Sequence, residues 1–176
     1  MFRDATKLVP RDSFIDAMRR VASSVTVVTT DGPAGRLGAT VSAFSSVSAD
    51  PPTILICLFA ESRIAKAVLE NKDFCVNVLS EEDSDIADRF AGRHDALVED
   101  RFSGIDCYGA PGTPPQIDGA TAFRCVQQQT ILSGSHLIIL GHVRHVLAGA
   151  ARPLTYRDGS YHRVLPKADR FLSAAT

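Results

Sequence analysis

The chain has 176 residues, of which 45% are hydrophobic and 22% are charged, and its formal net charge at pH 7 is −1. This composition is typical of a globular domain with a substantial core, and no apolar run approaches the roughly 20 residues of a membrane-spanning helix. Basic and acidic residues are interspersed without a Lys/Arg stripe, so we expect neither a nucleic-acid partner nor a membrane association.

The N-terminal region predicts a helix. Its first residues, MFRDATKLVPRD, are charged and lack an apolar signal region, so we expect a cytoplasmic location. In DSFIDAMRRVAS the apolar residues recur at helical spacing after Asp12 or Ser13, either of which is a candidate N-cap. We expect one domain over 1–176, in which 1–11 and 166–176 are extended or flexible tails.

Strand patterns dominate the first half of the chain. SVTVVTTD, residues 24–31, is β-branched and is linked by the turn-rich DGPAGRLG to a second strand over 37–48, which predicts a hairpin. The apolar run TILICLF, residues 53–59, is typical of a strand that is buried on both faces. A helix is expected from its N-cap at Ser62 to about Glu70, and FCVNVLS predicts another strand.

The second half of the chain is also rich in strands. Residues 81–92, EEDSDIADRFAG, predict a short helix that begins on acidic residues, and the Pro- and Gly-rich residues 93–120 predict a long loop. Two long strands over 120–132 and 136–147 form a predicted hairpin, and TYRDGSYHRV predicts two short strands. Because strands pair across short turns without regular βαβ alternation, we expect mainly antiparallel β structure in a closed or partly closed barrel with three helices.

Common nucleotide-binding and hydrolase motifs are missing. Gly32, Gly35 and Gly38 are spaced G-x-x-G-x-x-G, which is neither a dinucleotide fingerprint nor a P-loop, so we expect them to form the hairpin turn. SGSH, residues 133–136, looks like a hairpin tip, and no G-x-S-x-G is present. A serine hydrolase is therefore disfavoured, although a triad assembled from distant residues stays open.

Histidines and cysteines do not indicate a metal site. His142 and His145 are three residues apart on a predicted strand and so point to opposite faces, and we expect no bound metal. The four cysteines are widely spaced, without a C-x-x-C motif. Because Cys57, Cys75 and Cys125 lie in apolar strand-like runs, we expect buried reduced thiols rather than disulfides or zinc ligands.

The stretch TVSAFSSVSADPP, residues 40–52, has a small polar face. Alternate positions carry hydroxyl groups, interrupted by one phenylalanine: Thr40, Ser42, Phe44, Ser46 and Ser48. A solvated strand normally carries charged side chains, whereas short hydroxyls let a large ligand approach the backbone. A strand packed under another element, with locally satisfied serines, explains the pattern equally well.

An anion site is expected at the start of the second predicted helix. The free N–H groups of a helix N-terminus favour a phosphate, and here Ser62 is the N-cap while Arg63 would supply a charge-assisted hydrogen bond. Arg89 is a second candidate. Together with the hydroxyl-lined strand, these residues indicate a ligand with a planar polar ring at one end and a phosphate at the other, as in a flavin nucleotide.

Several segments together resemble the flavin reductase family with the FMN-binding split-barrel fold. They cover roughly residues 12–165 and are TVVTTDGPAGRLGATVSAFSSVSADPPTILICL, FCVNVLS, ADRFAG, DRFSGI, GSHLIILGHV and YRDGSYHRV. The resemblance implies a mainly β fold, a split barrel of antiparallel, Greek-key-like strands with a few flanking helices. It also implies a homodimer that binds FMN or FAD in a groove near the subunit interface, with NADH or NADPH as electron donor.

The resemblance further assigns residues to the flavin. Many contacts would be made through backbone groups, and they fall on Gly38, Ala39, Thr40, Ser42, Ala43, Cys57, Leu58, Phe59, Arg63, Ile64, Arg89 and Phe90. Ser62 joins this set as the helix cap of the anion site. Donors within residues 40–46, Ser46 among them, would stabilise the charge on the reduced ring.

The nicotinamide is expected to lie beside His136, which the resemblance makes the candidate catalytic residue. Ser135 stands where the family often has an aspartate, so the carboxylate that would orient the histidine ring is missing. Tyr156 and Gly159, in YRDGSY, match a region associated with the pyridine nucleotide.

The predicted function is that of an NAD(P)H:flavin oxidoreductase. Hydride would pass from C4 of the nicotinamide to N5 of the flavin, so the protein supplies orientation and polarity rather than a buried acid-base pair. The reduced flavin would then serve a partner oxygenase, as in two-component flavin-dependent monooxygenases. Two alternatives stay open: the reduction of another acceptor such as a corrinoid, and a flavin-binding module without turnover.

Overall fold

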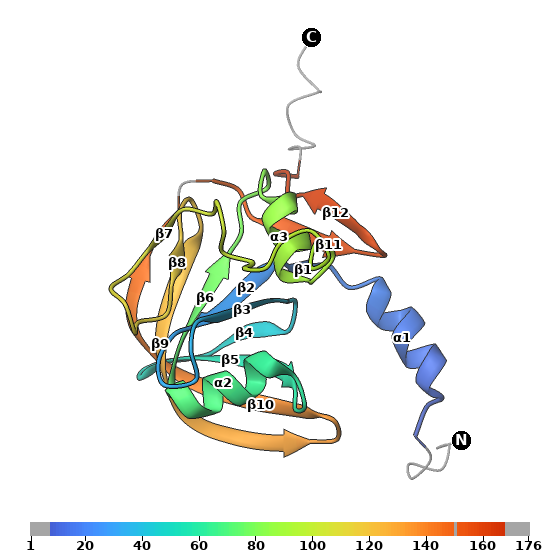
Figure 1. Ribbon diagram of the computed structural model, residues 1–176. Coiled ribbons are helices and arrows are strands. Elements are labelled where there is room, and N and C mark those ends of the chain that lie inside the picture. Colours follow the sequence, from blue (N-terminus) through green and yellow to red (C-terminus); the bar gives the residue numbers. More distant parts are fainter. Residues whose placement is uncertain (1–7, 150, 168–176) are drawn as a thin grey trace, which may run out of the picture.

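The computed structural model describes residues 8–149 and 151–167, in which three helices and twelve strands are present (Figure 1). The helices are α1 (Arg11–Arg19), α2 (Arg63–Asn71) and α3 (Ser84–Phe90). The strands are β1 (Ser23–Ser24), β2 (Thr26–Thr30), β3 (Leu37–Val41), β4 (Phe44–Ala49), β5 (Pro52–Phe59), β6 (Asp73–Val78), β7 (Cys107–Tyr108), β8 (Gln116–Ile117), β9 (Thr121–Ser133), β10 (His136–Leu147), β11 (Leu154–Arg157) and β12 (Ser160–Arg163).

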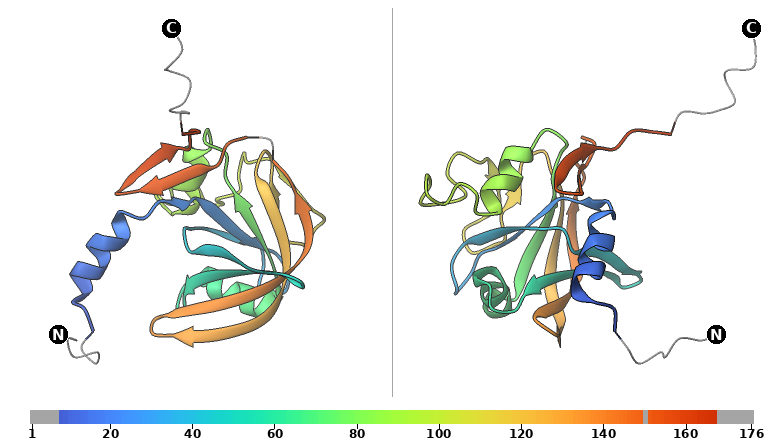
Figure 2. Two further views of the ribbon diagram at one scale, coloured as in Figure 1. Left: turned by 180° about the vertical axis from the view of Figure 1, so that it is seen from behind. Right: turned by 90° about the vertical axis from the view of Figure 1, so that its right-hand side faces the viewer.

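Seven strands form one strongly curved antiparallel sheet (Figure 2), in the order β3-β2-β6-β9-β10-β5-β4. β3 and β4 are consecutive in the chain, yet they lie at opposite ends of this order. The curved sheet therefore returns toward its own beginning, where Ser42 and Ala43 connect its two edges. This arrangement confirms the predicted antiparallel, partly closed barrel.

Two smaller sheets complete the β structure. β1, β11 and β12 form a three-stranded sheet, in which β11 and β12 are the predicted C-terminal hairpin. β7 pairs with β8 inside residues 93–120. The prediction that this segment is only a loop is therefore wrong. Strands of two residues are too short to leave a periodic pattern, so the sequence does not predict them.

The buried side chains form two clusters on either side of β2 and β3. One cluster fills the space between the curved sheet and α2, and its largest members include Ile56, Phe74 and Ile139. The other lies beneath α3 and residues 93–120, and includes Phe90 and Phe102. β3 is thus supported from both sides, by Val41 in the first cluster and by the contact of Gly38 with Phe90 and Phe102 of the second.

Helix α2 follows its prediction closely. Ser62 is the N-cap, and its Oγ accepts a hydrogen bond from the N–H of Ala65 at 3.3 Å. The helix ends where Lys72 adopts a left-handed conformation with φ of 67°. Its apolar face is buried against the sheet, which fixes the direction of its N-terminus.

Helix α1 departs from its prediction at its beginning. The N-cap is Pro10 rather than Asp12 or Ser13, because the extended backbone at Pro10 (ψ 141°) is where the helical conformation starts. The helix therefore takes in the last residue of the tail expected over 1–11, and the parts of the two tails at 1–7 and 168–176 lie outside the described residues. None of the residues of α1 is buried, and the helix projects away from the barrel (Figure 2).

The strand expected over 37–48 is wrong as a single strand. It is broken at Ser42 and Ala43, where the chain leaves β3 and enters β4 at the other edge of the sheet. β4 is exposed on both faces apart from the half-buried Phe44, and Val47, at a register shift of the β4–β5 pairing, is 50% exposed. The period-two pattern therefore does not mark a buried face in this half of the stretch.

Buried polar residues pin two connecting segments to the barrel. Asn77 accepts a hydrogen bond from the N–H of Ile117 at 2.9 Å, and Thr29 donates to the carbonyl of Pro115 at 2.5 Å. Asn71 accepts from the N–H of Ala34 at 2.7 Å and so closes the turn between β2 and β3. Because an unpaired buried polar group is costly, these contacts hold both segments in place.

All four cysteines are free thiols, and the predicted burial is confirmed for Cys75 and Cys125 but is wrong for Cys57. Cys75 and Cys125 are buried, and burial raises the pKa of each thiol to about 12. Cys57 is only half-buried, which places it at a surface rather than in the core. In the described part of the chain, none of the helices has the length and apolar character needed to cross a bilayer.

Candidate functional site

Two adjoining cavities form a groove at the edge where β3, β5 and α2 meet. The first, called the strand cavity, has a volume of about 330 Å³ and is lined by Ala39, Thr40, Val41, Ser42, Ala43, Cys57, Leu58, Phe59, Ser62, Ile64 and His136. The second, called the helix cavity, has a volume of about 640 Å³ and is lined by Arg36, Leu37, Gly38, Ala39, Ser62, Arg63, Ile64, Asp95, Val98, Glu99, Asp100, Arg101 and Phe102. Both volumes fall in the range of small-molecule sites, about 300–1,000 Å³.

The groove brings together most of the predicted flavin-binding residues. Ala39, Ser62 and Ile64 line both cavities, so the two form one continuous surface. The predicted residues in the groove are Gly38, Ala39, Thr40, Ser42, Ala43, Cys57, Leu58, Phe59, Ser62, Arg63, Ile64 and His136. They come from β3, the β3–β4 connection, β5, α2 and β10, which are distant in sequence.

Gly38 forms the floor of the helix cavity and leaves no room for a side chain. A Cβ atom there would lie 2.6 Å from Cε1 of Phe90 and 3.2 Å from Cζ of Phe102. Phe90 is 1% exposed and meets Phe102 edge-on, with 4.9 Å between ring centroids. The Phe90 ring therefore supports β3 from the core side and does not line the groove, so the flavin contact predicted for this residue stays a prediction that only its backbone could fulfil.

The hydroxyl groups of the predicted polar face are used in different ways. Thr40 Oγ1 donates to the carbonyl of Ala87 at 2.6 Å, so this hydroxyl ties β3 to α3. Ser46 lies on the exposed strand β4 and lines neither cavity of the groove. Ser42 lines the strand cavity, and its hydroxyl forms no hydrogen bond within residues 8–149 and 151–167.

His136 lies at the far wall of the strand cavity, at the beginning of β10. It is the cross-strand partner of Phe59, and the two rings are edge-on with 5.9 Å between centroids. Ser135 Oγ lies 3.0 Å from Nδ1 of His136. Ser135 therefore contacts the histidine ring, and Nε2 forms no hydrogen bond with the described residues.

The N-terminus of α2 opens onto the helix cavity. The backbone N–H groups of Arg63 and Ile64 form no hydrogen bond with a described residue, since the cap at Ser62 satisfies only that of Ala65. Arg63 is exposed, and its guanidinium forms none of the ion pairs in the described chain. This is an arrangement of donors suited to an anion.

Charged residues that the sequence did not single out form the outer wall of the helix cavity. Arg101 donates from Nε and Nη2 to the two carboxylate oxygens of Asp95, at 2.8 and 2.6 Å, and from Nη1 to the carbonyl of Phe90 at 3.0 Å. Arg36 Nη2 lies 2.7 Å from Oδ2 of Asp100. Arg101 lies in the DRFSGI segment, but nothing in its spacing indicates that it faces the start of α2.

Tyr156 and Gly159 lie beside the groove, in a cavity of about 540 Å³ between α1 and the β11–β12 hairpin, called the hairpin cavity. Ser42 lines both this cavity and the strand cavity. The Tyr156 ring packs edge-on against Tyr161, whose hydroxyl donates to Oδ1 of Asp88 at 2.6 Å. Burial, with this hydrogen bond, raises the pKa of Tyr161 to about 12, so the hydroxyl keeps its proton and holds the hairpin against α3.

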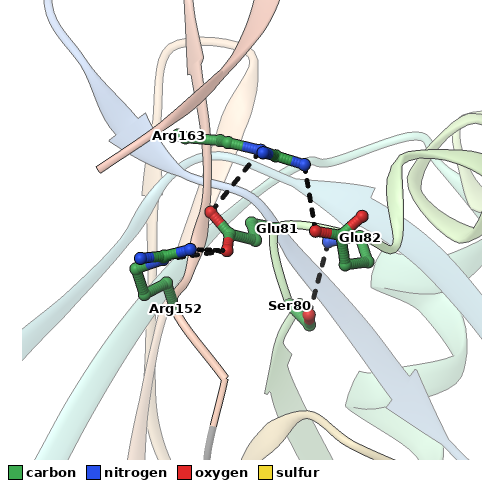
Figure 3. Close-up of polar contacts among 5 residues, drawn as sticks. All are labelled: Ser80, Glu81, Glu82, Arg152 and Arg163. Atoms are coloured by element: carbon green, nitrogen blue, oxygen red, sulfur yellow. Dashed lines mark hydrogen bonds and ion pairs between the residues drawn. The ribbon is translucent and has the colours of Figure 1, made fainter. Parts of the chain in front are cut away.

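A cluster of ion pairs also fixes the hairpin to the turn before α3 (Figure 3). Arg152 Nη2 lies 2.6 Å from Oε1 of Glu81, and Arg163 Nη2 lies 3.0 Å from Oε1 of Glu82. The Glu81 side chain is only 8% exposed, and the Arg152 guanidinium holds the pKa of its carboxyl below the usual range. The hairpin cavity is therefore bounded by a hairpin with a fixed position.

Arg89, the second predicted anion ligand, does not face the groove. Its guanidinium donates to the carbonyl of Ser103, and it lines a different cavity of about 490 Å³ on the other side of α3. This hydrogen bond to the backbone directs the Arg89 side chain away from the groove. Among the described residues, no group of three or more His, Cys, Asp or Glu side chains is placed to hold a metal ion.

The family model of the flavin reductase like domain matches residues 18–165. The chain belongs to this family. The FMN reductase (NADH) RutF of Ancylobacter novellus is 37% identical over 158 residues, which are 89% of this chain and 86% of the relative. The predicted family and the predicted split-barrel fold are both confirmed, and membership makes the chain an enzyme of the flavin reductase class.

Solved structures of similar proteins have the same fold as this chain. An NADH:FAD oxidoreductase, SgcE6 of Streptomyces globisporus C-1027, in complex with NAD and FAD fragments, has a TM-score of 0.81 at 28% identity, covering 93% of this chain and 100% of that one. Nitrilotriacetate monooxygenase component B from Mycobacterium thermoresistibile has a TM-score of 0.79 at 27% identity, covering 94% and 96%.

The residues of the groove fit a flavin nucleotide. The strand cavity has small side chains on one wall, at Ala39, Ser42 and Ala43, which leave the backbone accessible to a flat ring. The helix cavity offers free N–H groups and Arg63 to a phosphate. A ring site and an anion site are thus joined end to end, which is the order of groups in FMN.

Proposed function

We propose that the protein oxidises NADH, reduces FMN, and delivers the reduced flavin to a partner oxygenase. Membership of the flavin reductase family supports the general activity, and the relative named FMN reductase (NADH) supports this choice of flavin and donor. The observation that carries the proposal is the groove itself, because it joins a small-residue wall, His136 and an anion site in one continuous surface.

In this proposal the strand cavity holds the ring system of the flavin, which supplies the hydride-accepting chemistry that no side chain provides. The small side chains of Ala39 and Ala43 leave room for the ring, and the free hydroxyl of Ser42 is available to a polar edge of the ring. Cys57 donates its backbone N–H to the carbonyl of Ala43 at 3.0 Å, which closes the wall between β5 and the β3–β4 connection. This hydrogen bond holds in place the wall against which the flavin ring would lie.

The helix cavity holds the phosphate. The N–H groups of Arg63 and Ile64 and the guanidinium of Arg63 provide the donors, and the helix dipole adds a favourable field. Because Ser62 donates its hydroxyl hydrogen to the carbonyl of Phe59 at 2.6 Å, it acts as a cap that orients these donors. Its part in phosphate binding is indirect.

His136 positions the nicotinamide at the open side of the strand cavity. Nδ1 is in contact with Ser135 Oγ, so Nε2 is the nitrogen that can hydrogen-bond a donor nucleotide. The hairpin cavity, which shares Ser42 with the strand cavity, gives the rest of that nucleotide a surface that includes Tyr156 and Gly159.

The proposal includes a homodimer in the cytoplasm, formed by the single domain. Large apolar side chains are exposed on α1 and at the tip of the β9–β10 hairpin, with exposures of 56% for Phe14, 49% for Met18 and 67% for Leu132. A second copy that covers these side chains would account for a helix that buries nothing against its own barrel. Sedimentation of the purified protein as a monomer at micromolar concentration would contradict this part.

One experiment tests the enzymatic part. The purified protein is mixed anaerobically with FMN and then with NADH, and the flavin absorbance at about 450 nm is followed, since it falls on reduction. FAD, riboflavin and NADPH are compared under the same conditions. Persistence of the flavin absorbance with both donors would leave a flavin-binding module, and fast reduction coupled only to a corrinoid would support that acceptor instead.

A further inference from the structure

The helix cavity carries as many carboxylates as guanidinium groups. Its charged lining residues are Arg36, Arg63, Arg101, Asp95, Glu99 and Asp100. A phosphate that enters this cavity therefore meets negative as well as positive charge. A site built to retain a phosphate would have the opposite balance, with excess cations.

Two of the three arginines are already paired with carboxylates. Arg101 is bidentate to Asp95, and Arg36 is paired with Asp100 at 2.7 Å. Arg63 and Glu99 are left without an ion pair among residues 8–149 and 151–167. A bound phosphate is therefore attracted by Arg63 and repelled by Glu99.

The Arg101–Asp95 pair packs closely against the backbone at Gly92 and Phe90. Gly92 has φ of +84°, and a Cβ atom there would lie 2.8 Å from Nη2 of Arg101 and 3.1 Å from Oδ2 of Asp95. Arg101 also donates to the carbonyl of Phe90, so its guanidinium is held at the end of α3. The hydrogen bond from Arg101, with the nearby charge of Arg63, holds the pKa of Asp95 below its usual range, so this carboxylate is charged at neutral pH.

We propose that Asp95 and Glu99 weaken the binding of the flavin's phosphate in the helix cavity and so set how tightly FMN is held relative to a flavin without a phosphate. Asp95 accepts hydrogen bonds from Nε and Nη2 of Arg101, so these donors are not available to the phosphate. Asp95 also offsets part of the positive charge of Arg63, and Glu99 adds a second negative charge to the cavity. This inference rests on the proposed function, because it concerns how the same groove holds its flavin. It makes the two carboxylates positioning and specificity residues that act on the phosphate end alone.

Two charge-neutralising variants test the proposal by binding, without turnover. Glu99→Gln removes a charge and no described contact, and Asp95→Asn keeps an oxygen that accepts from Arg101. Glu70→Gln, an exposed residue of α2 that lines no part of the helix cavity, is the matched control. The dissociation constants of FMN and of riboflavin, which lacks the phosphate, are measured by flavin fluorescence for each protein.

Each variant should bind FMN about threefold more tightly, with riboflavin affinity unchanged, and the gain should shrink at high salt as screening weakens the repulsion. The control should match the original protein for both flavins. If both variants bind FMN with unchanged or weaker affinity, the proposed role of the two carboxylates is overturned, but the proposed flavin-binding function is not. If the original protein binds neither flavin, the proposed function fails as well.

Discussion

Replacing Gly38 with alanine should destabilise the protein by about 1–3 kcal/mol, which is the usual cost of overpacking a core. The new methyl carbon would lie 2.6 Å from Cε1 and 2.8 Å from Cδ1 of Phe90, well inside the roughly 3.5–4.0 Å of a favourable carbon contact. Phe90 is 1% exposed and is held edge-on by Phe102, so its ring has no free space to move into. β3 must instead shift toward the groove, and we expect FMN binding to weaken too.

Urea unfolding measures the first effect: the midpoint falls while the slope with denaturant stays the same. Phe90→Leu removes the ring atoms that the methyl group would meet. In the double variant, the two losses should therefore be less than additive by more than about 0.5 kcal/mol. Additive losses would show that the ring and the β3 backbone are not in contact, and would refute this account of the floor of the groove.

Three other predictions concern the ends of the groove and its supports. Arg63→Ala should weaken FMN binding by about 1–3 kcal/mol and leave riboflavin binding unchanged, whereas Lys66→Ala, an exposed cation on the same helix, should change neither in the same titrations. His136→Ala should slow flavin reduction in anaerobic single turnovers far more than it changes FMN affinity, and equal rates would remove it from the nicotinamide site. Arg152 lowers the pKa of Glu81 in the folded protein, so the ionised carboxylate stabilises the fold. This stabilisation is fully present above the usual glutamate pKa of about 4.3, and it is lost as the pH falls through the lower pKa of the folded state. The difference in urea midpoint between the original protein and Glu81→Gln should therefore be largest near neutral pH and shrink in acid, and a constant difference would contradict it.

The elements whose positions the sequence predicted well are those with a local pattern. β5 forms where the apolar run predicts a strand, and Thr53, Ile54, Ile56 and Leu58 are buried. The prediction that both of its faces are buried is wrong, because Leu55 and Cys57 are half-buried and Phe59 is exposed at the groove. α2 combines a serine N-cap with apolar residues at helical spacing, and both signals are local. Where a residue's environment is decided by its near neighbours in sequence, the sequence pattern is sufficient to predict the element.

The break at Ser42 and Ala43 could not be predicted in the same way. The alternation of hydroxyl and apolar residues continues across the break, so nothing local shows that the chain leaves one edge of the barrel and joins the other. That change of partner depends on the curvature of the whole sheet. The amphipathic pattern of α1 likewise predicted a helix correctly but could not show that its apolar face is uncovered by the described chain.

The choice between Arg89 and Arg101 also depends on tertiary structure. Both arginines lie near the end of α3 or in the segment that follows, and both carry the same charge. Arg89 turns to the carbonyl of Ser103, while Arg101 reaches back to Asp95 at the mouth of the helix cavity. Only the path of residues 93–106 decides which of them faces the N-terminus of α2.

The hydroxyl-rich stretch shows why residue type alone was an ambiguous signal. Thr40 donates to the carbonyl of Ala87, and Ser48 donates to the carbonyl of Asp50 at 2.9 Å, so both are satisfied by the protein, as the simpler explanation required. Ser42 is the member of this face that both lines the strand cavity and keeps a free hydroxyl among the described residues. Since Ser42 also lines the hairpin cavity, it lies between the proposed sites of the flavin ring and of the donor nucleotide. The stretch therefore forms part of the groove mainly because its small side chains expose the backbone at the point where β3 ends, and one serine supplies the polar contact.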